Sequence, residues 1–441
     1  MCAIGRPELI RIRRFSPKLI SVAHLSAGCG NSLLVCHKIV KGGLYQAQKL
    51  LAFGDRCAMF DFTLFAAIGF LFAAYAVVGN DALQTLGTFI ASNNRLHWFW
   101  LFLFAATILV VTFTYGWVVN DGDPSYGRLA NAKKYPAVDV QWYHTLPPLV
   151  LLIITRFGVP VSTSFMVLTV FASIGGLSSM LQKSLIGYGL AFAMGLFVFL
   201  IASVTVEKFF RKTEHQQHHP IWVVLQWITT AYLWSVWLIQ DFANIFVFLP
   251  RQLSAVESFT AMFAIVALLA YTFANRGGPV QRILKTKTAV TDIRSATLID
   301  FIYASLLFYF KELNDIPMST TFVFLGLIAG REYGFAITQK AVNLLRTCEI
   351  ALSDIAKAYI GLVLSIDMAV LLPFIAKGLA GAGFPLDELI PTQGYAVFIT
   401  TANLLLIPVA MHLAKKSIAR MTILATLLAG AAAAFFTIPI A

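Results

Sequence analysis

The chain has 441 residues, of which 59% are hydrophobic and only 12% are charged, and its formal net charge is +12. A soluble domain carries roughly 25% charged residues, so this composition excludes a soluble fold. Several apolar runs near the ~20 residues that span a bilayer indicate a polytopic α-helical membrane protein, and the short alternating segments of a membrane β-barrel are missing. The five cysteines have neither the spacing of a zinc site nor that of a disulfide framework.

The first 58 residues differ from the rest of the chain. They hold nine basic residues and only two acidic ones, and no apolar run long enough to span a membrane. Such a segment is typical of an organelle transit peptide, of a basic tail, or of an extension upstream of a start at Met59. We therefore interpret 1–58 as a basic N-terminal extension that is not part of the membrane fold.

From Met59 onward, long apolar runs alternate with polar connections. The predicted full crossings are 61–92, 97–119, 184–207, 221–250, 256–275, 358–376, 394–411 and 420–438. Two further segments, 145–175 and 297–330, are interrupted near their centres at Pro160 and Pro317, which leaves halves of about 12–15 residues. Such halves are too short to cross a bilayer, so we expect two re-entrant helical hairpins that enter and leave on the same side.

The charged connections test this layout. The three strongly basic connections, 207–220, 276–294 and 415–420, fall on one side if both interrupted segments are re-entrant. The positive-inside rule makes that side cytoplasmic, and it places the near-neutral 120–143 and the acidic 377–392 outside. We predict a multi-pass integral protein of a bacterial inner membrane or its equivalent, or of an organellar membrane if 1–58 is a transit peptide.

Two short phrases occur twice and in the same order. The phrase from Pro160 to Ser164 (PVSTS) returns 157 residues later from Pro317 to Thr321 (PMSTT). An aspartate inside an apolar segment, Asp81, likewise returns after 160 residues as Asp241. Three crossings separate the starts of the two aspartate segments, and an odd number inverts the second copy. We therefore predict inverted-topology repeats with broken helices, an arrangement common in secondary transporters. The predicted parts are repeat 1 (59–215), repeat 2 (216–377) and two C-terminal spans (378–441).

Each proline phrase has the composition of a helix start. Proline is tolerated in the first turn of a helix, and serine or threonine side chains cap the N–H groups left free there. Deep in a membrane, such a tip offers hydroxyls, N–H groups and a positive helix end to an anion. The alternative is that the hydroxyls only bond carbonyls of their own helix. The predicted anion ligands at the two tips are Ser162, Thr163, Ser164, Ser319, Thr320 and Thr321.

The aspartate phrases have a different chemistry. An ionised carboxylate in a membrane costs at least ~2.5–3.5 kcal/mol, so an aspartate there indicates a functional site unless it lies at a span end facing water. A carboxylate with unwound carbonyls and neutral polar neighbours forms an oxygen site for Na⁺, or a site for H⁺. The predicted cation ligands are Asp81, Asp241, Asn80, Gln240 and Thr85, with Gln84 and Asn244 as further polar groups nearby.

In these four phrases the chain resembles the PiT-type inorganic phosphate transporters, whose halves each carry an N-D-x-A-N phrase and a P-V-S-T-T-H phrase. The resemblance covers about residues 60–375 and depends on the four phrases together. It implies inverted repeats, two hairpins, and cation-coupled uptake of phosphate, or of sulfate in some relatives. It also implies that Asp81 and Asp241 serve the cation, while Asn244, Gln84 and the tip hydroxyls hold the anion.

The chain departs from the family pattern in both halves, and one of these departures falls at the same place in each. Gln84 and Gln240 stand where the family has asparagine. Phe165 and Phe322 replace its histidine, and Phe248 stands where a turn of small residues is usual. Longer or apolar side chains change the size and polarity of a site, so these departures bear on the substrate more than on the fold.

The predicted function is secondary active transport: a cation-coupled symport of a small inorganic oxyanion, with phosphate as the leading substrate and Na⁺ or H⁺ as the coupling ion. The lost histidines motivate an alternative, a passive channel or a non-transporting regulatory protein on the same fold. An enzyme is not expected, because the HExxH, GxSxG and GxxxxGK[ST] motifs are missing. We expect no cofactor and no nucleic acid; the partners are the anion and the lipid bilayer, and a homodimer is left open.

Overall fold

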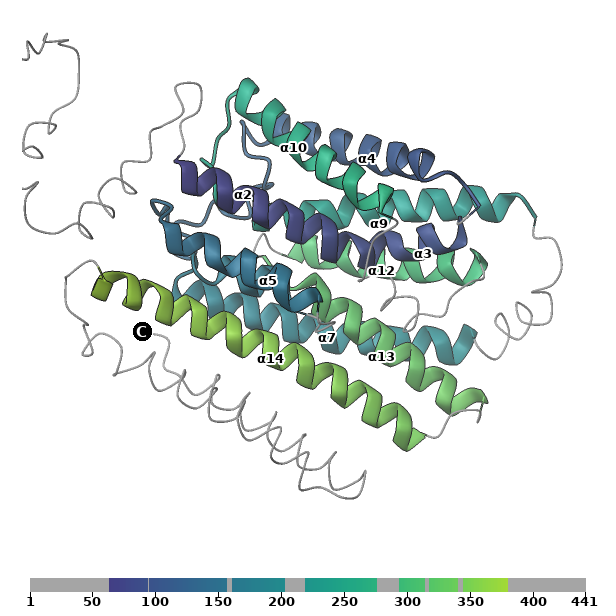
Figure 1. The fold of residues 1–441 in the computed structure, drawn as a ribbon. Coiled ribbons are helices and arrows are strands. Elements are labelled where there is room, and N and C mark those ends of the chain that lie inside the picture. Colours follow the sequence, from purple (N-terminus) through teal and green to yellow (C-terminus); the bar gives the residue numbers. More distant parts are fainter. Residues whose placement is uncertain are drawn as a thin grey trace, which may run out of the picture. The chain divides into compact units, whose positions relative to one another are not determined.

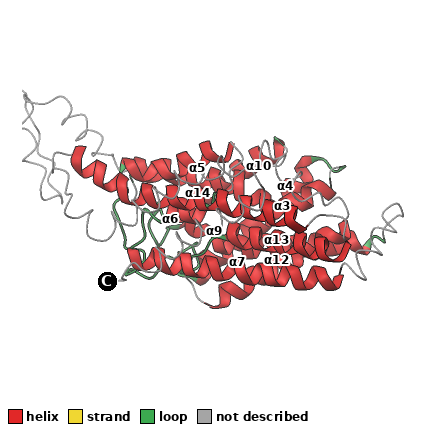
Figure 2. Cartoon of the chain, turned by 90° about the horizontal axis from the view of Figure 1, so that it is seen from below, coloured by secondary structure: helices red, strands yellow, loops and turns green. Residues whose placement is uncertain are grey.

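The computed structural model describes residues 63–93, 95–156, 161–202, 219–275, 293–313, 317–339 and 344–379. Within these ranges every regular element is a helix, as Figure 2 shows. Four of the helices are long and apolar enough to cross a membrane. The chain is therefore an all-α membrane protein, as predicted. The extension 1–58 and the predicted spans 394–411 and 420–438 lie outside the described residues.

The first predicted crossing, 61–92, is one helical rod that changes pitch near its centre. Its parts are α2 (Leu64–Ala76), a π-helical turn (Val77–Asp81) and α3 (Ala82–Ser92). The rod begins at Thr63, whose hydroxyl accepts a hydrogen bond from the backbone of the first turn. Gly79 lies in the π-helical turn, where the helix widens instead of breaking, so the chain stays helical.

Four helices are the candidate spans: α4 (Trp98–Val119), α7 (Ile174–Ala202), α9 (Ile221–Phe246) and α10 (Ala255–Ala274). Three of them confirm the crossings predicted at 97–119, 221–250 and 256–275. α7 begins ten residues before the expected 184, because the Ser173 hydroxyl accepts from Gly176 N at 3.2 Å and starts the helix there. α9 contains neither glycine nor proline and is unbroken at Asp241, so the break expected in this helix is wrong.

The two interrupted segments each contain two helices. The first has α5 (Leu146–Arg156) and α6 (Thr163–Leu168); the second has α12 (Ile293–Leu313) and α13 (Thr320–Gln339). α12 and α13 have 21 and 20 residues, longer than the expected half-length. The difference arises because polar turns extend a helix beyond its apolar stretch, which in α12 is only Ala296–Phe310. The last described helix, α14 (Leu344–Lys377), begins before the expected 358 for the same reason.

Specific contacts give the directions of the neighbouring helices in Figure 1. α4 and α10 are antiparallel, since Trp117 Nε1 donates to Leu253 O at 2.9 Å at one end and Phe102 packs on Phe273 at the other. α2–α3 and α9 are also antiparallel: Phe70 lies on Phe246, and the end of α3 lies on the start of α9. These are the pairs that occupy matching positions in the two predicted repeats.

α7 and α13 run parallel and pack closely along most of their length. Glycines at every fourth position of α13 face the backbone of α7. A Cβ atom built on Gly326 would lie 2.3 Å from Tyr188 O, and one built on Gly330 would lie 2.2 Å from Phe192 O. Gly195 on α7 makes the reciprocal approach to Leu327 O, at 2.6 Å. This glycine seam is the small-residue packing that brings membrane helices together.

The returning arm of each hairpin packs on the last span of the other predicted repeat. In one case α13 lies on α7 along the glycine seam. In the other, α6 lies on α14: the Thr169 hydroxyl donates to Ser365 O at 3.3 Å, and a Cβ on Gly361 would lie 3.0 Å from the Val161 side chain. Both pairs are parallel. The two halves are therefore interlocked through their hairpins.

Candidate functional site

The first tip is the start of α6. Ser162 caps this helix, because its hydroxyl accepts from Phe165 N at 3.3 Å. Residues 161–169 are all buried. α6 has only six residues, so its N-terminus contributes little helix dipole. The first tip therefore offers an anion its hydroxyl groups rather than a helix end.

The second tip is the start of α13, and Ser319 caps it in the same way, accepting from Phe322 N at 3.2 Å. The backbone N–H of Ser319 donates to Ser184 Oγ on α7 at 2.8 Å. This bond fixes the second tip to the span that carries the glycine seam. Sequence reasoning missed Ser184, because nothing near it indicates that a segment 135 residues later reaches it.

The two tips contact each other directly. Ser164 Oγ donates to Met318 O at 3.0 Å, across 154 residues of sequence. Phe165 and Phe322 are the residues that directly follow the two proline phrases. Their rings pack edge to face with centroids 5.6 Å apart. The two residues that replace the histidine of the family pattern thus form one apolar contact between the halves.

Asp241 on α9 connects the two tips. Asn244 Nδ2 donates to Asp241 Oδ1 and also to Ser164 Oγ, the latter at 3.1 Å. Thr320 Oγ1 donates to Asp241 Oδ2 at 3.2 Å. All four side chains are buried, and Asp241 is only 1% exposed. We refer to Asp241, Asn244, Ser164 and Thr320 as the tip network; it brings predicted cation ligands and predicted anion ligands together.

Three buried oxygen atoms in or beside the tip network have no hydrogen-bond partner: Gln240 Oε1, Asn244 Oδ1 and Thr163 Oγ1. The Gln240 amide is held in place, since its Nε2 donates to Leu307 O at 3.3 Å. Folded proteins leave few buried acceptors without a hydrogen bond, so each of these three atoms needs a structural reason. Amide and hydroxyl oxygens beside a carboxylate are the ligands that a hard cation prefers. These residues therefore fit a Na⁺ ion next to Asp241.

The first aspartate phrase is described only in its backbone. Asp81 ends the π-helical turn, whose residues contact α9 and α10. The side chains of Asn80, Asp81 and Gln84 lie outside the described residues. Thr85 and Thr321 are buried. The roles of these five residues stay predictions.

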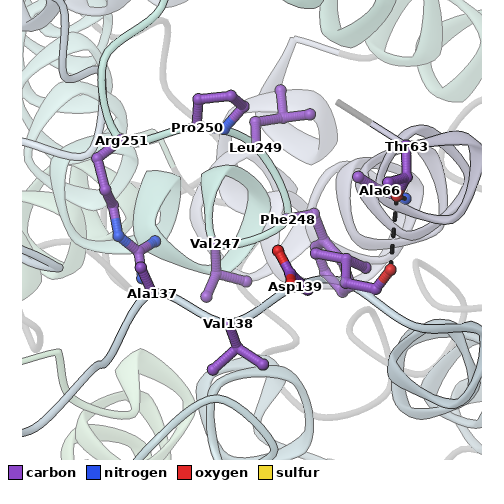
Figure 3. Close-up of a pocket in the computed structure, with 11 residues that line it drawn as sticks. Thr63, Ala66, Ala137, Val138, Asp139, Val247, Phe248, Leu249, Pro250 and Arg251 are labelled. Carbon is purple, nitrogen blue, oxygen red and sulfur yellow. Dashed lines mark hydrogen bonds between the residues drawn. The ribbon is translucent and has the colours of Figure 1, made fainter. Parts of the chain in front are cut away.

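A cavity of about 230 Å³ lies away from the tip network, near the start of α2 and the end of α9 (Figure 3). Its lining includes Asp139, Phe248 and Arg251, and none of the predicted ligands. Burial lowers the pKa of the Arg251 guanidinium, and the nearby carboxylate of Asp123 acts in the opposite direction. The Phe248 ring also packs against Gly69 of α2, where a Cβ would lie 2.3 Å from it. A bulky side chain is therefore packed in the turn that follows α9.

Comparison with known proteins gives one distant likeness. No protein-family model and no curated protein matches the chain. Among solved structures the chain is similar to "The sodium-dependent phosphate transporter", with 16% sequence identity and a TM-score of 0.42. That similarity covers 74% of this chain and 98% of the other. At this identity and TM-score the likeness assigns no substrate to the chain.

Proposed function

We propose that this protein is a secondary active transporter that couples a cation to the symport of a small inorganic oxyanion, with phosphate as the leading substrate. The observation that carries the proposal is the tip network. A buried carboxylate, Asp241, is bonded to Thr320 of one tip, and its neighbour Asn244 is bonded to Ser164 of the other. The residues that would bind a cation therefore share hydrogen bonds with the residues that would bind an anion.

This sharing supplies a mechanism for coupling. Without a cation, the Asp241 carboxylate accepts the Thr320 hydroxyl and the Asn244 amide, so those donors are not available to an anion. A Na⁺ ion held by Asp241 and the unpaired oxygens of Gln240 and Asn244 competes for the carboxylate, and a proton on Asp241 has the same effect. The hydroxyl and amide are then free to donate to an oxyanion, and the cation offsets its charge.

The arrangement of the halves supports alternating access about the tip network. α4 and α10 are antiparallel, as matching members of inverted repeats are. Each hairpin also packs on the last span of the other half, so movement of one half carries the opposite hairpin with it. We propose that inverted repeats open the tip network to one side of the membrane at a time.

The test is uptake by purified protein in proteoliposomes. Radiolabelled phosphate and sulfate are offered with a Na⁺ gradient, with a pH gradient, and with neither. We expect accumulation of an oxyanion that requires one of the gradients and is strongly reduced in Asp241→Asn and Asp81→Asn. Absence of accumulation for every oxyanion, with both variants behaving as the wild type, contradicts the proposal.

A second candidate function is supported by the aromatic contact between the tips. Phe165 and Phe322 place an apolar pair where an anion would pass between the halves. This arrangement favours a protein that binds its anion without transporting it, or a passive channel that opens only when the pair separates. The same liposomes distinguish these cases, because a channel gives flux without a gradient requirement, and a regulatory protein gives equilibrium binding of phosphate without any flux.

A further inference from the structure

A second buried carboxylate lies outside the tip network. Asp300 on α12 is 1% exposed and accepts two hydrogen bonds at 2.8 Å, from Thr88 Oγ1 on α3 and from Thr230 Oγ1 on α9. It joins three helices that belong to both predicted repeats. Thr230 precedes Asp241 by eleven residues on α9, which is roughly 16 Å along a helix, so the two carboxylates are separate sites.

Asp300 has no positively charged partner in the described part of the chain. Its polar contacts are the two threonine hydroxyls, and no ion pair joins it to another side chain. α3 carries no ionisable residue, and Arg294 lies six residues before Asp300 on α12 itself. The ionisable residues on the other helices that pack against α12 are Tyr232 and Asp241 on α9, Lys183 and Tyr188 on α7, and Arg331, Glu332 and Tyr333 on α13.

A carboxylate in this position needs a cation or a proton for part of the time, because burial disfavours its charge and two hydroxyls only partly offset that effect. Both oxygens of Asp300 are already in contact with hydroxyl donors at 2.8 Å. The unpaired acceptors that accompany Asp241 have no counterpart on Thr88, Thr230 or Asp300. A proton requires no further ligands and fits this compact arrangement, whereas a metal ion requires several more oxygens.

Polar side chains lead from Asp300 to one end of the helices. On α3 the Ser92 hydroxyl lies one turn after Thr88, and on α9 the Gln226 amide lies one turn before Thr230. Gln226 hydrogen-bonds to Ser92 and, at 3.0 Å, to Asn93. The chain then turns to the surface at the exposed Arg95. Polar residues therefore lie along α3 and α9 between Asp300 and the end of the helices that the positive-inside rule assigns to the cytoplasm.

We propose that Asp300 is a proton-binding site that exchanges its proton with the cytoplasmic side along the polar face of α3 and α9. On uptake, an O–H bond forms at one carboxylate oxygen of Asp300 with a proton from bulk water, and the threonine beside that oxygen becomes the acceptor. On release the proton returns to bulk water, and both threonines donate again. The charge of Asp300 thereby alters contacts that hold the two halves together, so transport becomes sensitive to internal pH.

The first experiment does not depend on transport. Infrared difference spectra of the full-length protein in liposomes are recorded between roughly pH 5 and pH 8. We expect a band from a protonated carboxylic acid in a buried environment that is present in the wild type and missing in Asp300→Asn. A band that persists unchanged in Asp300→Asn, or no such band in the wild type, overturns the proposal.

The second experiment rests on the proposed transport function. Oxyanion uptake by the wild type is expected to change roughly tenfold with internal pH over that range, and uptake by Asp300→Asn to change less than about twofold. Thr88→Val and Thr230→Val shift the pH midpoint upward, because each removes a donor to the ionised carboxylate. The control Thr107→Val, in which a threonine that bonds only its own helix is replaced, leaves the profile unchanged.

The two failures are distinguishable. If the wild type takes up no oxyanion, the transport function fails, while the infrared result still decides whether Asp300 binds a proton. If uptake occurs and Asp300→Asn keeps the wild-type pH profile, or changes the Na⁺ dependence instead, the proposed role of Asp300 is wrong.

Discussion

The two hairpin tips have similar sequences but very different supports. The second tip begins α13, a helix of 20 residues that is packed on α7 by the glycine seam and bonded to Ser184. The first tip begins α6, which has six residues and ends in a turn. That turn is held from outside the helix, by the bond from Ser173 N to Lys134 O at 2.8 Å and by stacking of His144 on Phe171. α7 and the second tip therefore pack as one unit, whereas the first tip depends on contacts from outside its own short helix.

The largest expected effect comes from removing the charge that connects the tips. Asp241→Asn cannot bind a cation by its charge, and Thr320 and Asn244 lose a charged acceptor. A hydrogen bond to a charged group contributes ~1.5–3 kcal/mol, so we expect uptake to fall about 10- to 100-fold. The measurement is the initial rate of oxyanion uptake. Asp121→Asn is the matched control, because Asp121 is exposed and has φ of 50°, which asparagine also adopts.

The support of the second tip is tested by filling the glycine seam. Gly330→Ala places a methyl group against Phe192 O, where a Cβ would lie only 2.2 Å away. We expect α13 and α7 to be forced apart at a cost of ~1–3 kcal/mol, measured as a lower midpoint of thermal unfolding in detergent. Gly189→Ala is the control on α7, because its Cβ would meet nothing within 4 Å. Equal stability of the two variants would show that the seam does not hold the second tip.

The support of the first tip is expected to weaken in mild acid through His144, which lies before α5 and accepts from Gln141 N at 2.8 Å. Burial disfavours the imidazolium and lowers the pKa of His144 from 6.5 to about 4. As the pH falls, the unfolded chain binds this proton first. The contribution of the neutral His144 to the free energy of unfolding is therefore complete above the unfolded pKa of 6.5. It is lost as the pH falls toward about 4.

From pH 7 to roughly pH 5.5 this linkage lowers the free energy of unfolding by ~1 kcal/mol. Thermal unfolding in detergent at a series of pH values measures the effect. His144→Asn keeps an acceptor near Gln141 but does not titrate, so its midpoint should be less sensitive to pH in this range. A steeper dependence in His144→Asn than in the wild type would contradict the assignment.

The smallest effect is expected from a single tip hydroxyl. Ser164→Ala removes one bond to Met318 O and one from Asn244, each contributing ~0.5 kcal/mol net, so the KM for the oxyanion should rise about fivefold. Thr320→Val removes a bond to the charged Asp241 carboxylate and should raise KM more. Ser305→Ala is the control, because Ser305 is half-buried and its hydroxyl bonds only Phe301 O of its own helix. A smaller effect at Thr320 than at Ser164 would contradict this order.

The parts of this site that were predictable from sequence depend on local chemistry. Ser162 and Ser319 cap helices three residues before the N–H groups that they accept, and such spacing is visible in a sequence. The place of Asp241 beside the tips was also predicted, because the phrase around it is repeated in register with the proline phrases. Whether these residues bind ions stays a prediction.

The parts that were missed depend on distant contacts or on helix continuity. Asp300 is joined to Thr88 across 212 residues, and no local pattern identifies such a pair. The lengths of α12 and α13 were underestimated because hydropathy reports apolar character, and a helix continues through polar turns as well. The glycine seam is visible in the sequence as glycine at every fourth position from Gly326 to Gly334, a spacing typical of closely packed membrane helices.

The aromatic contact between the tips has a consequence for electrical leak. Phe165 and Phe322 come from opposite halves, so the contact between them lasts only while the two tips stay together. Water and small ions leave narrow apolar constrictions readily, because nothing there replaces their hydration. In the proposed transport function, a closed pair therefore insulates the membrane against the uncoupled passage of protons and salt. Smaller side chains at both positions would let ions leak through the protein and would lower the membrane potential.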